Sequence, residues 1–367
     1  MFSEEELVNE VATMRFLTDQ TLISVPHTLH SGTKKESPLE LGSFIMMEYI
    51  EHETKTYAAL HTPGYRRVYL GCHPPAFEPV RLGGLPQSKL RDLNATFDTS
   101  SPYIETLAEI NLQHLIHQRK DSVESADDYR RKFVARQLFR KLARDKKLTN
   151  PLLEKGPFRI RCDYLQTANM LLNENPTQIA GVVDWEFTYA APVEFSYAPP
   201  WWLLIEKPES WSKGIEDWTR VFEHRLKTFL KAMKDCENTA IQQGRLREDQ
   251  RLSGPMYQSW ESGDFWIMYA ATHSFAFDEI YWQKVDPRVF GPTEIEAAWK
   301  ESLDLLDEKE RDEMELVARK LMEMGTRTLS WDLDEYTLAF REQLKESGKA
   351  KVENILKENK RTWIKFS

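Results

Sequence analysis

The sequence has 367 residues, of which 41% are hydrophobic and 29% are charged, within the range of ordinary globular proteins. A formal net charge of −9 is unfavourable for general nucleic-acid binding, and no apolar run approaches the roughly 18 residues that span a bilayer. The acidic start lacks the pattern of a secretory signal, and three scattered cysteines suit neither a disulfide framework nor a zinc site. We therefore expect an intracellular, cytoplasmic protein that binds neither nucleic acid nor membrane.

Residues 1–52 are expected to form a small unit with one helix and two strands. Apolar residues recur at helical spacing from about Glu4 to Thr18, and the segments 23–30 and 41–50 have the composition of strands. Residues 53–98 contain Pro, Gly and Arg without clear periodicity. We expect this second stretch to be an irregular insert.

Residues 99–367 are predicted to form a larger and mainly helical unit. Helical periodicity covers several segments, and the last two carry Glu with Lys or Arg at helical spacing, as on solvated faces. A break at Gly156-Pro157 is followed by a short strand and an apolar hairpin within residues 158–186. The pattern as a whole predicts an α+β protein. The expected helices are 103–119, 126–147, 221–233, 256–282, 294–324 and 334–360.

The predicted hairpin connects two residues whose side chains carry oxygen ligands. Asn169 precedes its first strand, and Asp184 follows its second strand, Ile179-Ala-Gly-Val-Val183. Because a hairpin brings its ends together, we expect Asn169 and Asp184 to lie side by side. Mg²⁺ prefers oxygen ligands and keeps several waters, so a protein needs to supply only one or two of them. The pattern predicts a metal site, with Glu186 as a further ligand or a structural cap; hydrogen bonding that merely holds the loop is the alternative.

The segment Cys162-Asp-Tyr-Leu-Gln-Thr-Ala-Asn169, with Asp184-Trp-Glu186 after the hairpin, resembles the core of the aminoglycoside phosphotransferase family. In that core, H-G-D-x-x-x-x-N is followed by I-D-W-E, and a fungal branch has Cys-Asp-Asp-Leu-Arg-Pro-x-Asn as the first element. The resemblance extends from about residue 4 to residue 290 and is weak between 55 and 95. It implies a protein-kinase-like fold with a reduced N-terminal lobe and a large, mainly helical C-terminal lobe.

The resemblance also implies a nucleotide site with ATP and Mg²⁺ as cofactors and a small-molecule acceptor. Glu10 lies in a segment similar to the helix whose glutamate pairs with the ATP-contacting lysine. The run that ends in Glu48, Tyr49 and Ile50 is similar to the strand that leads to the adenine-binding hinge. These four residues are the expected contacts to the nucleotide.

Two departures from the family pattern concern catalysis. The aspartate that accepts the substrate proton should lie five residues before Asn169, but Tyr164 occupies this position and Asp163 lies one residue earlier. A phenol is a poor proton acceptor at neutral pH, whereas a loop one residue longer would restore Asp163 as an unusual base. The family's glycine-rich hairpin and lysine strand are also missing before the helix of Glu10. A segment upstream of Met1 would explain this second departure but not Tyr164.

The sequence therefore leaves two functional hypotheses. The first is a phosphotransferase-family protein that is catalytically impaired or inactive, and the alternative is an active Mg-ATP-dependent phosphotransferase that acts on a small-molecule hydroxyl. An acceptor pocket would lie among the aromatic residues of the larger unit. Packing in the core is the commoner role of such residues, including a lone histidine. The candidates are Trp201, Trp202, Trp260, Trp266, Tyr269 and His273.

Overall fold

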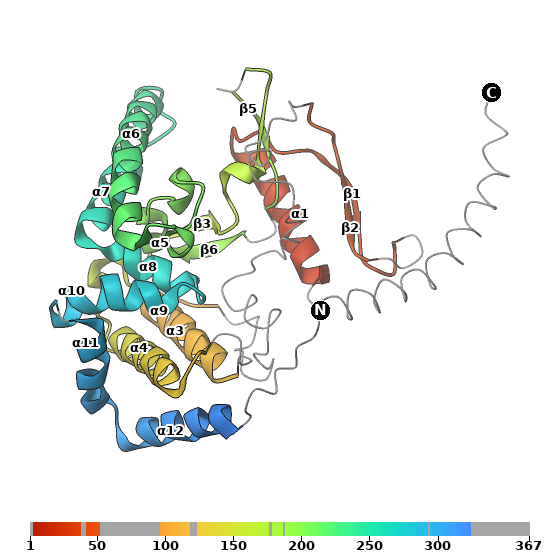
Figure 1. The fold of residues 1–367 in the computed structure, drawn as a ribbon. Coiled ribbons are helices and arrows are strands. Elements are labelled where there is room, and N and C mark those ends of the chain that lie inside the picture. The colour runs from red at the N-terminus through yellow and green to blue at the C-terminus, as the bar shows by residue number, and fades with distance from the viewer. Residues whose placement is uncertain are drawn as a thin grey trace, which may run out of the picture.

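The computed structural model has the expected α+β composition, with many helices and small antiparallel sheets (Figure 1). Within the part of the chain that it describes, each sheet has two strands. None of the described helices is both long enough and apolar enough to cross a lipid bilayer. The structure describes residues 3–37, 42–51, 96–117, 123–175, 178–185, 188–292 and 294–323.

The N-terminal unit consists of helix α1 (Ser3–Gln20) and an antiparallel pair formed by strands β1 (Thr28–Gly32) and β2 (Phe44–Met47). The predicted helix is confirmed, but both strands are shorter than the expected ranges. Residues 21–27 lie outside the sheet because the Ser24 carbonyl accepts a hydrogen bond from the Val182 N–H, 2.9 Å away in the central hairpin. Most of the expected insert, residues 52–95, lies outside the described residues.

Helices α3 (Ser100–His117) and α4 (Ala126–Arg144) pack against each other, close to the predicted ranges. Helix α4 begins at a clear capping signal, because the Ser125 side chain accepts a hydrogen bond from the Asp128 N–H. Acidic residues in its first turn and basic residues in its last turn complement the helix dipole.

The central strands form two separate antiparallel pairs. Strand β3 (Phe158–Cys162) pairs with β6 (Thr188–Pro192), so that Cys162 lies opposite Thr188. Strand β4 (Met170–Leu172) pairs with β5 (Ile179–Val182), which confirms the predicted hairpin. Strand β6 is not among the elements expected from the sequence.

The remaining helices form the helical body together with α3 and α4. The single helix predicted over 256–282 is wrong, since Gly263 adopts a left-handed conformation with φ of 80° and separates two helices. The helix predicted over 294–324 is likewise divided near Ser302, and the one predicted over 334–360 lies outside the described residues. The helices are α5 (Val193–Tyr197), α6 (Gly214–Gln242), α7 (Ser253–Ser262), α8 (Asp264–Thr272), α9 (Phe277–Ile280), α10 (Asp286–Phe290), α11 (Ile295–Glu301) and α12 (Glu308–Glu323), with a π-helical turn at Tyr281–Val285.

Two hydrophobic clusters stabilise the helical body and the contact between α1 and the hairpin. The large cluster fills the helical body and contains fully buried aromatic side chains such as Trp218 and Phe222. The small cluster consists of Met14 and Leu17 from α1 with Val182 and Trp185 from the end of the hairpin. The small cluster therefore attaches α1 to the hairpin, and Figure 1 shows the N-terminal unit lying to one side of the helical body.

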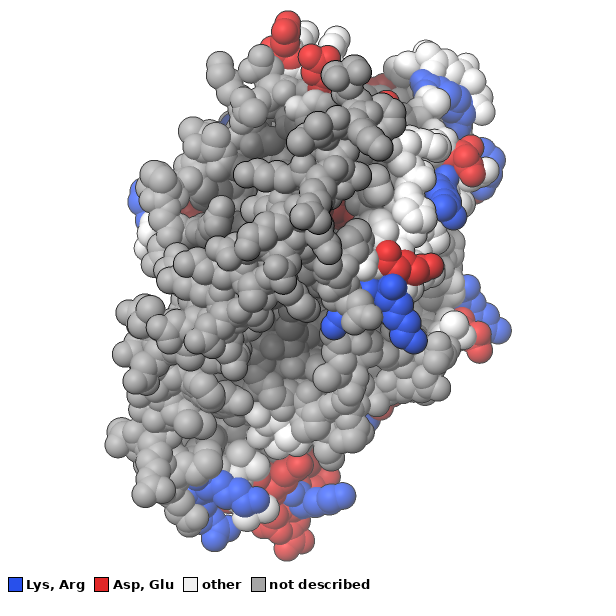
Figure 2. All heavy atoms as spheres, turned by 90° about the vertical axis from the view of Figure 1, so that its right-hand side faces the viewer, with Lys and Arg blue, Asp and Glu red and all other residues white. Residues whose placement is uncertain are grey.

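Charged side chains of both signs are interspersed on the surface. On the face shown in Figure 2, the described Lys and Arg residues lie next to Asp and Glu residues rather than in a continuous basic area. Ion pairs such as Arg130 with Glu315 and Lys141 with Glu310 join α4 to α12. Over the described part of this face, no basic stripe of the kind that binds a phosphate backbone is visible.

Candidate functional site

The hairpin places Asn169 and Asp184 at the same end of the β4–β5 pair, as the sequence predicts. The Val183 N–H donates a hydrogen bond to the Asn169 carbonyl at 3.0 Å, so Asp184 follows directly after the residue that is bonded to Asn169. The Cys162 thiol lies 3.7 Å from the Asp184 carbonyl oxygen and links the end of β3 to the same point. Three chain segments therefore meet at the backbone of these two residues.

Asn169 is a buried residue with 4% of its surface exposed. Its Nδ2 group donates a hydrogen bond to the Tyr164 carbonyl at 2.8 Å, which closes the loop between β3 and β4. Because the amide nitrogen is used in this bond, the amide oxygen is the atom of this side chain that could bind a cation. Asn169 can hold the loop and supply an oxygen ligand at the same time.

Asp184 has an unusual backbone conformation, with φ of 62° in the left-handed region. A non-glycine residue rarely adopts this conformation, and such strained residues are concentrated at functional sites. The residue is exposed, but nearby protein partly desolvates its carboxylate and raises its pKa above the ordinary value. A bound cation would favour the ionised form of this carboxylate.

Helix α1 places Glu10 next to Asp184. Burial and the neighbouring Asp184 carboxylate raise the pKa of Glu10 to about 7, and a hydrogen bond from the Trp185 backbone N–H opposes part of this rise. Among the described residues, Glu10 forms no ion pair with a lysine or arginine. The two carboxylates are thus close enough to repel each other, and no ion pair of Glu10 with a described Lys or Arg offsets this repulsion.

Asp163 is held by two side chains of the β3–β6 pair. One carboxylate oxygen accepts a hydrogen bond from Arg161 Nε at 2.7 Å, and the other accepts one from the Tyr189 hydroxyl at 2.9 Å. Both oxygens of this carboxylate are therefore occupied by protein donors. This geometry indicates a structural role in the loop, while the adjacent Tyr164 is the residue whose carbonyl is bonded to Asn169.

Arg161 and Tyr189 are partners of Asp163 that the sequence interpretation does not include. A signal for Arg161 exists, because residues two apart on an extended strand lie on the same face and Arg161 precedes Asp163 by two positions. No comparable signal exists for Tyr189, which reaches Asp163 only because β6 pairs with β3.

The three expected hinge residues have different environments. The Glu48 N–H is hydrogen-bonded to the His27 carbonyl at 2.9 Å, and Tyr49 is 77% exposed. Ile50 packs on the hairpin, because its Cδ1 atom lies 2.3 Å from the position that a Cβ atom would take at Gly181. The structure therefore brings Ile50 to the hairpin, whereas Glu48 and Tyr49 face solvent.

The metal-binding capacity of the described residues is small. No group of three or more His, Cys, Asp and Glu side chains among them could enclose a metal ion, and Glu186 lies outside the described residues. The Asn169 amide and the Asp184 carboxylate nevertheless form a pair of hard oxygen donors. This pair suits Mg²⁺, which takes one or two protein oxygens and completes its shell with water and phosphate.

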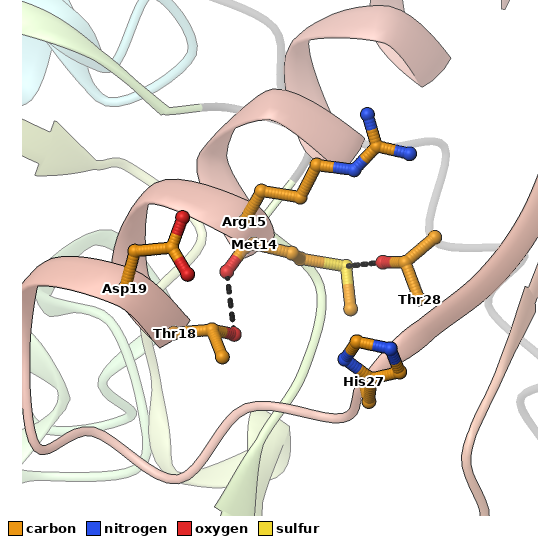
Figure 3. A pocket seen from close by; sticks show the side chains of 6 residues that line it. All are labelled: Met14, Arg15, Thr18, Asp19, His27 and Thr28. Atoms are coloured by element: carbon orange, nitrogen blue, oxygen red, sulfur yellow. Dashed lines mark hydrogen bonds between the residues drawn. The ribbon is translucent and has the colours of Figure 1, made fainter.

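A small hollow lies between α1 and β1 (Figure 3). It has a volume of about 60 Å³, below the roughly 300–1,000 Å³ of typical small-molecule pockets. The Met14 sulfur and the Thr28 hydroxyl lie 3.9 Å apart across it, and none of the predicted site residues lines it. This hollow is too small for a nucleotide. Its lining residues are Met14, Arg15, Thr18, Asp19, His27 and Thr28.

The aromatic residues expected near an acceptor pocket have two kinds of environment. Trp260 and Trp266 contact Phe265 in the large hydrophobic cluster, in agreement with a packing role. His273 instead stacks on Tyr269 at the end of α8, with ring centroids 3.9 Å apart.

Charged residues lie close to the aromatic residues around Tyr269 and His273. Lys207 Nζ lies 5.5 Å from the Trp201 ring, and the Tyr269 hydroxyl donates a hydrogen bond to Glu209 at 2.7 Å. Lys207 and Glu209 are not part of the sequence interpretation, which considers only aromatic residues and His273 in this region.

No protein-family profile matches the sequence, and no curated protein matches it.

Proposed function

We propose that this protein is a kinase-like member of the aminoglycoside phosphotransferase type that binds Mg²⁺ and the phosphates of ATP at Asn169 and Asp184, with impaired catalysis. The observation that carries the proposal is the hydrogen-bonded hairpin, which joins a buried loop asparagine to a strained aspartate. Kinases hold their metal ions with an asparagine of the catalytic loop and an aspartate after the following hairpin.

The position of α1 supports the same proposal. In the family that the sequence resembles, a helix of the N-terminal lobe carries the glutamate that pairs with the ATP-contacting lysine, and Glu10 of α1 lies close to Asp184 and the Trp185 backbone. Contacts between Met14, Leu17 and Trp185 fix this helix on the end of the hairpin. The packing of α1 on the hairpin therefore holds the Glu10 carboxylate close to Asp184.

The residues of the site supply some of the functions that phosphoryl transfer needs and lack others. Asn169 and Asp184 would hold Mg²⁺, which supplies charge neutralisation at the phosphates when it is bound. The loop keeps Asn169 oriented through the Tyr164 carbonyl. Position 164 supplies a phenol in place of a carboxylate, and both Asp163 oxygens are bonded to Arg161 and Tyr189. The residues that would position the metal and phosphates are thus retained, whereas the expected base is missing. We therefore expect slow turnover of ATP.

The test is Mg-ATP binding by titration calorimetry and ATP hydrolysis, measured on the parent protein and on Tyr164→Asp. We expect Mg²⁺-dependent binding in both, and faster hydrolysis in Tyr164→Asp by about a hundredfold, as for a restored general base. Asp184→Asn should lose the Mg²⁺ dependence of binding, whereas Asp235→Asn, on the exposed face of α6, should keep it. Absence of Mg²⁺-dependent ATP binding in the parent would overturn the proposal.

A further inference from the structure

Three polar side chains meet where β3 ends and β6 begins, at the start of the loop that leads to Asn169. Arg161 lies opposite Tyr189 in the register of the two strands, and Asp163 follows Arg161 by two positions. The Asp163 carboxylate accepts hydrogen bonds from Arg161 Nε at 2.7 Å and from the Tyr189 hydroxyl at 2.9 Å. We call the side chains of Arg161, Asp163 and Tyr189 the loop anchor.

The loop anchor is attached to the helical body. The Arg161 Nη1 group donates a hydrogen bond to the Phe195 carbonyl, and Arg161 Cζ lies 5.7 Å from the centroid of the Phe195 ring. Phe195 has no exposed surface and belongs to the large hydrophobic cluster. The Tyr189 ring packs against the same cluster, 6.3 Å from the ring of Tyr103 on α3. Both partners of Asp163 are therefore held by the densely packed part of the molecule.

The residue after Asp163 determines how the Asn169 amide is turned. A carbonyl oxygen only accepts hydrogen bonds, so the Tyr164 carbonyl selects the orientation in which Asn169 Nδ2 faces it, at 2.8 Å. This orientation leaves Oδ1 as the atom that can bind a cation, because the amide nitrogen carries only donors. Without the bond to Tyr164, the amide could rotate and exchange the places of its oxygen and nitrogen.

The loop anchor and the Asn169 bond act on the same short piece of backbone. Asp163 and Tyr164 are joined by one planar peptide unit, so two hydrogen bonds on the Asp163 side chain restrain the backbone that leads to the Tyr164 carbonyl. The Leu165 N–H donates to the Cys162 carbonyl at 3.3 Å and closes a turn around these two residues. A displacement of Asp163 would therefore move the Tyr164 carbonyl relative to Asn169 Nδ2.

We infer that the loop anchor positions the metal ligand, by holding the Tyr164 carbonyl so that Asn169 keeps Oδ1 available for Mg²⁺. The inference rests on the proposed binding of Mg-ATP at Asn169 and Asp184. Arg161, Asp163 and Tyr189 are positioning residues in this role and do not touch the metal. Loss of groups that orient metal ligands typically lowers metal affinity by about 10–100-fold. The loop anchor should therefore act on the Mg²⁺-dependent part of ATP binding.

The test is titration calorimetry of Tyr189→Phe and the parent, with ATP in the presence of Mg²⁺ and with ATP in EDTA. Tyr189→Phe removes one hydroxyl bonded to Asp163 and keeps the ring. We expect the affinity for Mg-ATP to fall about tenfold, with the affinity for metal-free ATP unchanged. The matched control is Ser253→Ala, which removes a hydroxyl bonded to the Glu237 carboxylate between α7 and α6. It should retain both affinities of the parent.

A second measurement needs no nucleotide. Hydrogen exchange followed by mass spectrometry should show faster exchange in residues 163–169 of Tyr189→Phe, with unchanged exchange in α8. Unchanged exchange in residues 163–169 would mean that the Tyr189 hydroxyl does not restrain the loop, and would overturn the inference.

The outcomes separate this inference from the proposed function. Mg-ATP binding by the parent with equal affinity in Tyr189→Phe would overturn the inference alone. An equal loss of affinity with and without Mg²⁺ would also overturn it, because the variant would then act on the fold as a whole. Failure of the parent to bind Mg-ATP would overturn the proposed function and the inference with it. If Tyr189→Phe does not fold, Asp163→Asn decides by the same titrations, since its amide has one acceptor oxygen for two donors.

Discussion

The N-terminal unit and the helical body differ in how much apolar surface they bury. In the helical body, α3, α4, α6 and α8 enclose one continuous cluster in which Trp218 has no exposed surface and stacks on Phe222, with ring centroids 4.4 Å apart. The N-terminal unit shares only the small cluster around Trp185 and leaves many large apolar side chains exposed. These include Val8, Phe16, Leu22, Ile23, Leu29, Met46, Met47 and Tyr49.

The candidate site lies in the less densely packed of these two regions. Regions with few buried contacts open at lower free energy than a continuous core, and binding sites are often built from such regions. Asp184 directly precedes Trp185, so the end of the hairpin that carries Asp184 belongs to the weakly packed side. We expect α1 to separate from the hairpin at a lower free energy than global unfolding requires.

The largest expected effect comes from truncating one tryptophan in each region. Trp218→Ala removes a fully buried ring and should lower the free energy of unfolding by about 3–5 kcal/mol. Trp185→Ala, at a residue with 4% exposed surface, should instead act locally and release α1. Hydrogen exchange measured by mass spectrometry should show faster exchange throughout the body in Trp218→Ala, but faster exchange of α1 with unchanged α8 in Trp185→Ala. Equal acceleration of α1 and α8 by both variants would contradict the comparison.

The next effect concerns a buried carboxylate in the helical body. Asp286 has 3% of its surface exposed, and burial raises its pKa to about 6 from an ordinary value of 3.8. The native state therefore binds this proton more tightly than the unfolded state, and stability falls as the pH rises between about 4 and 6. Asp286→Asn should remove this loss and stabilise the protein by about 2–3 kcal/mol at pH 8, with little change at pH 4.

The measurement is chemical unfolding of Asp286→Asn and the parent at pH 4, 6 and 8. Asp249→Asn is a control at an exposed residue whose carboxylate has a lowered pKa. A stability difference between Asp286→Asn and the parent that does not grow with pH would show that the burial of Asp286 does not set its ionisation.

The smallest effect tests the contact between the expected hinge and the hairpin. A Cβ atom at Gly181 would lie 2.3 Å from Ile50 Cδ1, so Gly181→Ala should cost about 1–3 kcal/mol by overpacking. Ile50→Ala removes the obstructing atom and should relieve this cost in the double variant. Thermal unfolding of the four proteins of the cycle gives the coupling energy. Additive effects would mean that Ile50 does not lie on the hairpin in solution.

Much of the local structure follows from the sequence. The hairpin between Asn169 and Asp184 is predictable because two short apolar runs flank a polar turn, and a hairpin must bring its ends together. Helices α1, α3 and α4 follow from apolar residues at helical spacing and from the Ser125 cap. The break at Gly263 escapes prediction because a glycine inside a periodic segment is compatible with either a helix interior or a C-terminal cap.

The candidate site is predictable to a smaller extent. Asn169 and Asp184 lie close in the chain topology, so their approach needs only one hairpin. Glu10 and Asp184 are brought together from distant parts of the chain, and the expectation for Glu10 depends on the resemblance rather than on its local pattern. Tyr189 reaches Asp163 only through the pairing of β6 with β3, which no local periodicity indicates.

The α+β class, the hairpin with its two oxygen-bearing ends and the phenol at position 164 all follow from local properties of the sequence, namely periodicity, turn chemistry and residue identity. The environment of each carboxylate follows from the tertiary structure. Asp163 is bonded through both oxygens, whereas Glu10 is buried beside Asp184, whose charge raises its pKa. The ionisation and availability of a side chain depend on neighbours that packing supplies from distant segments.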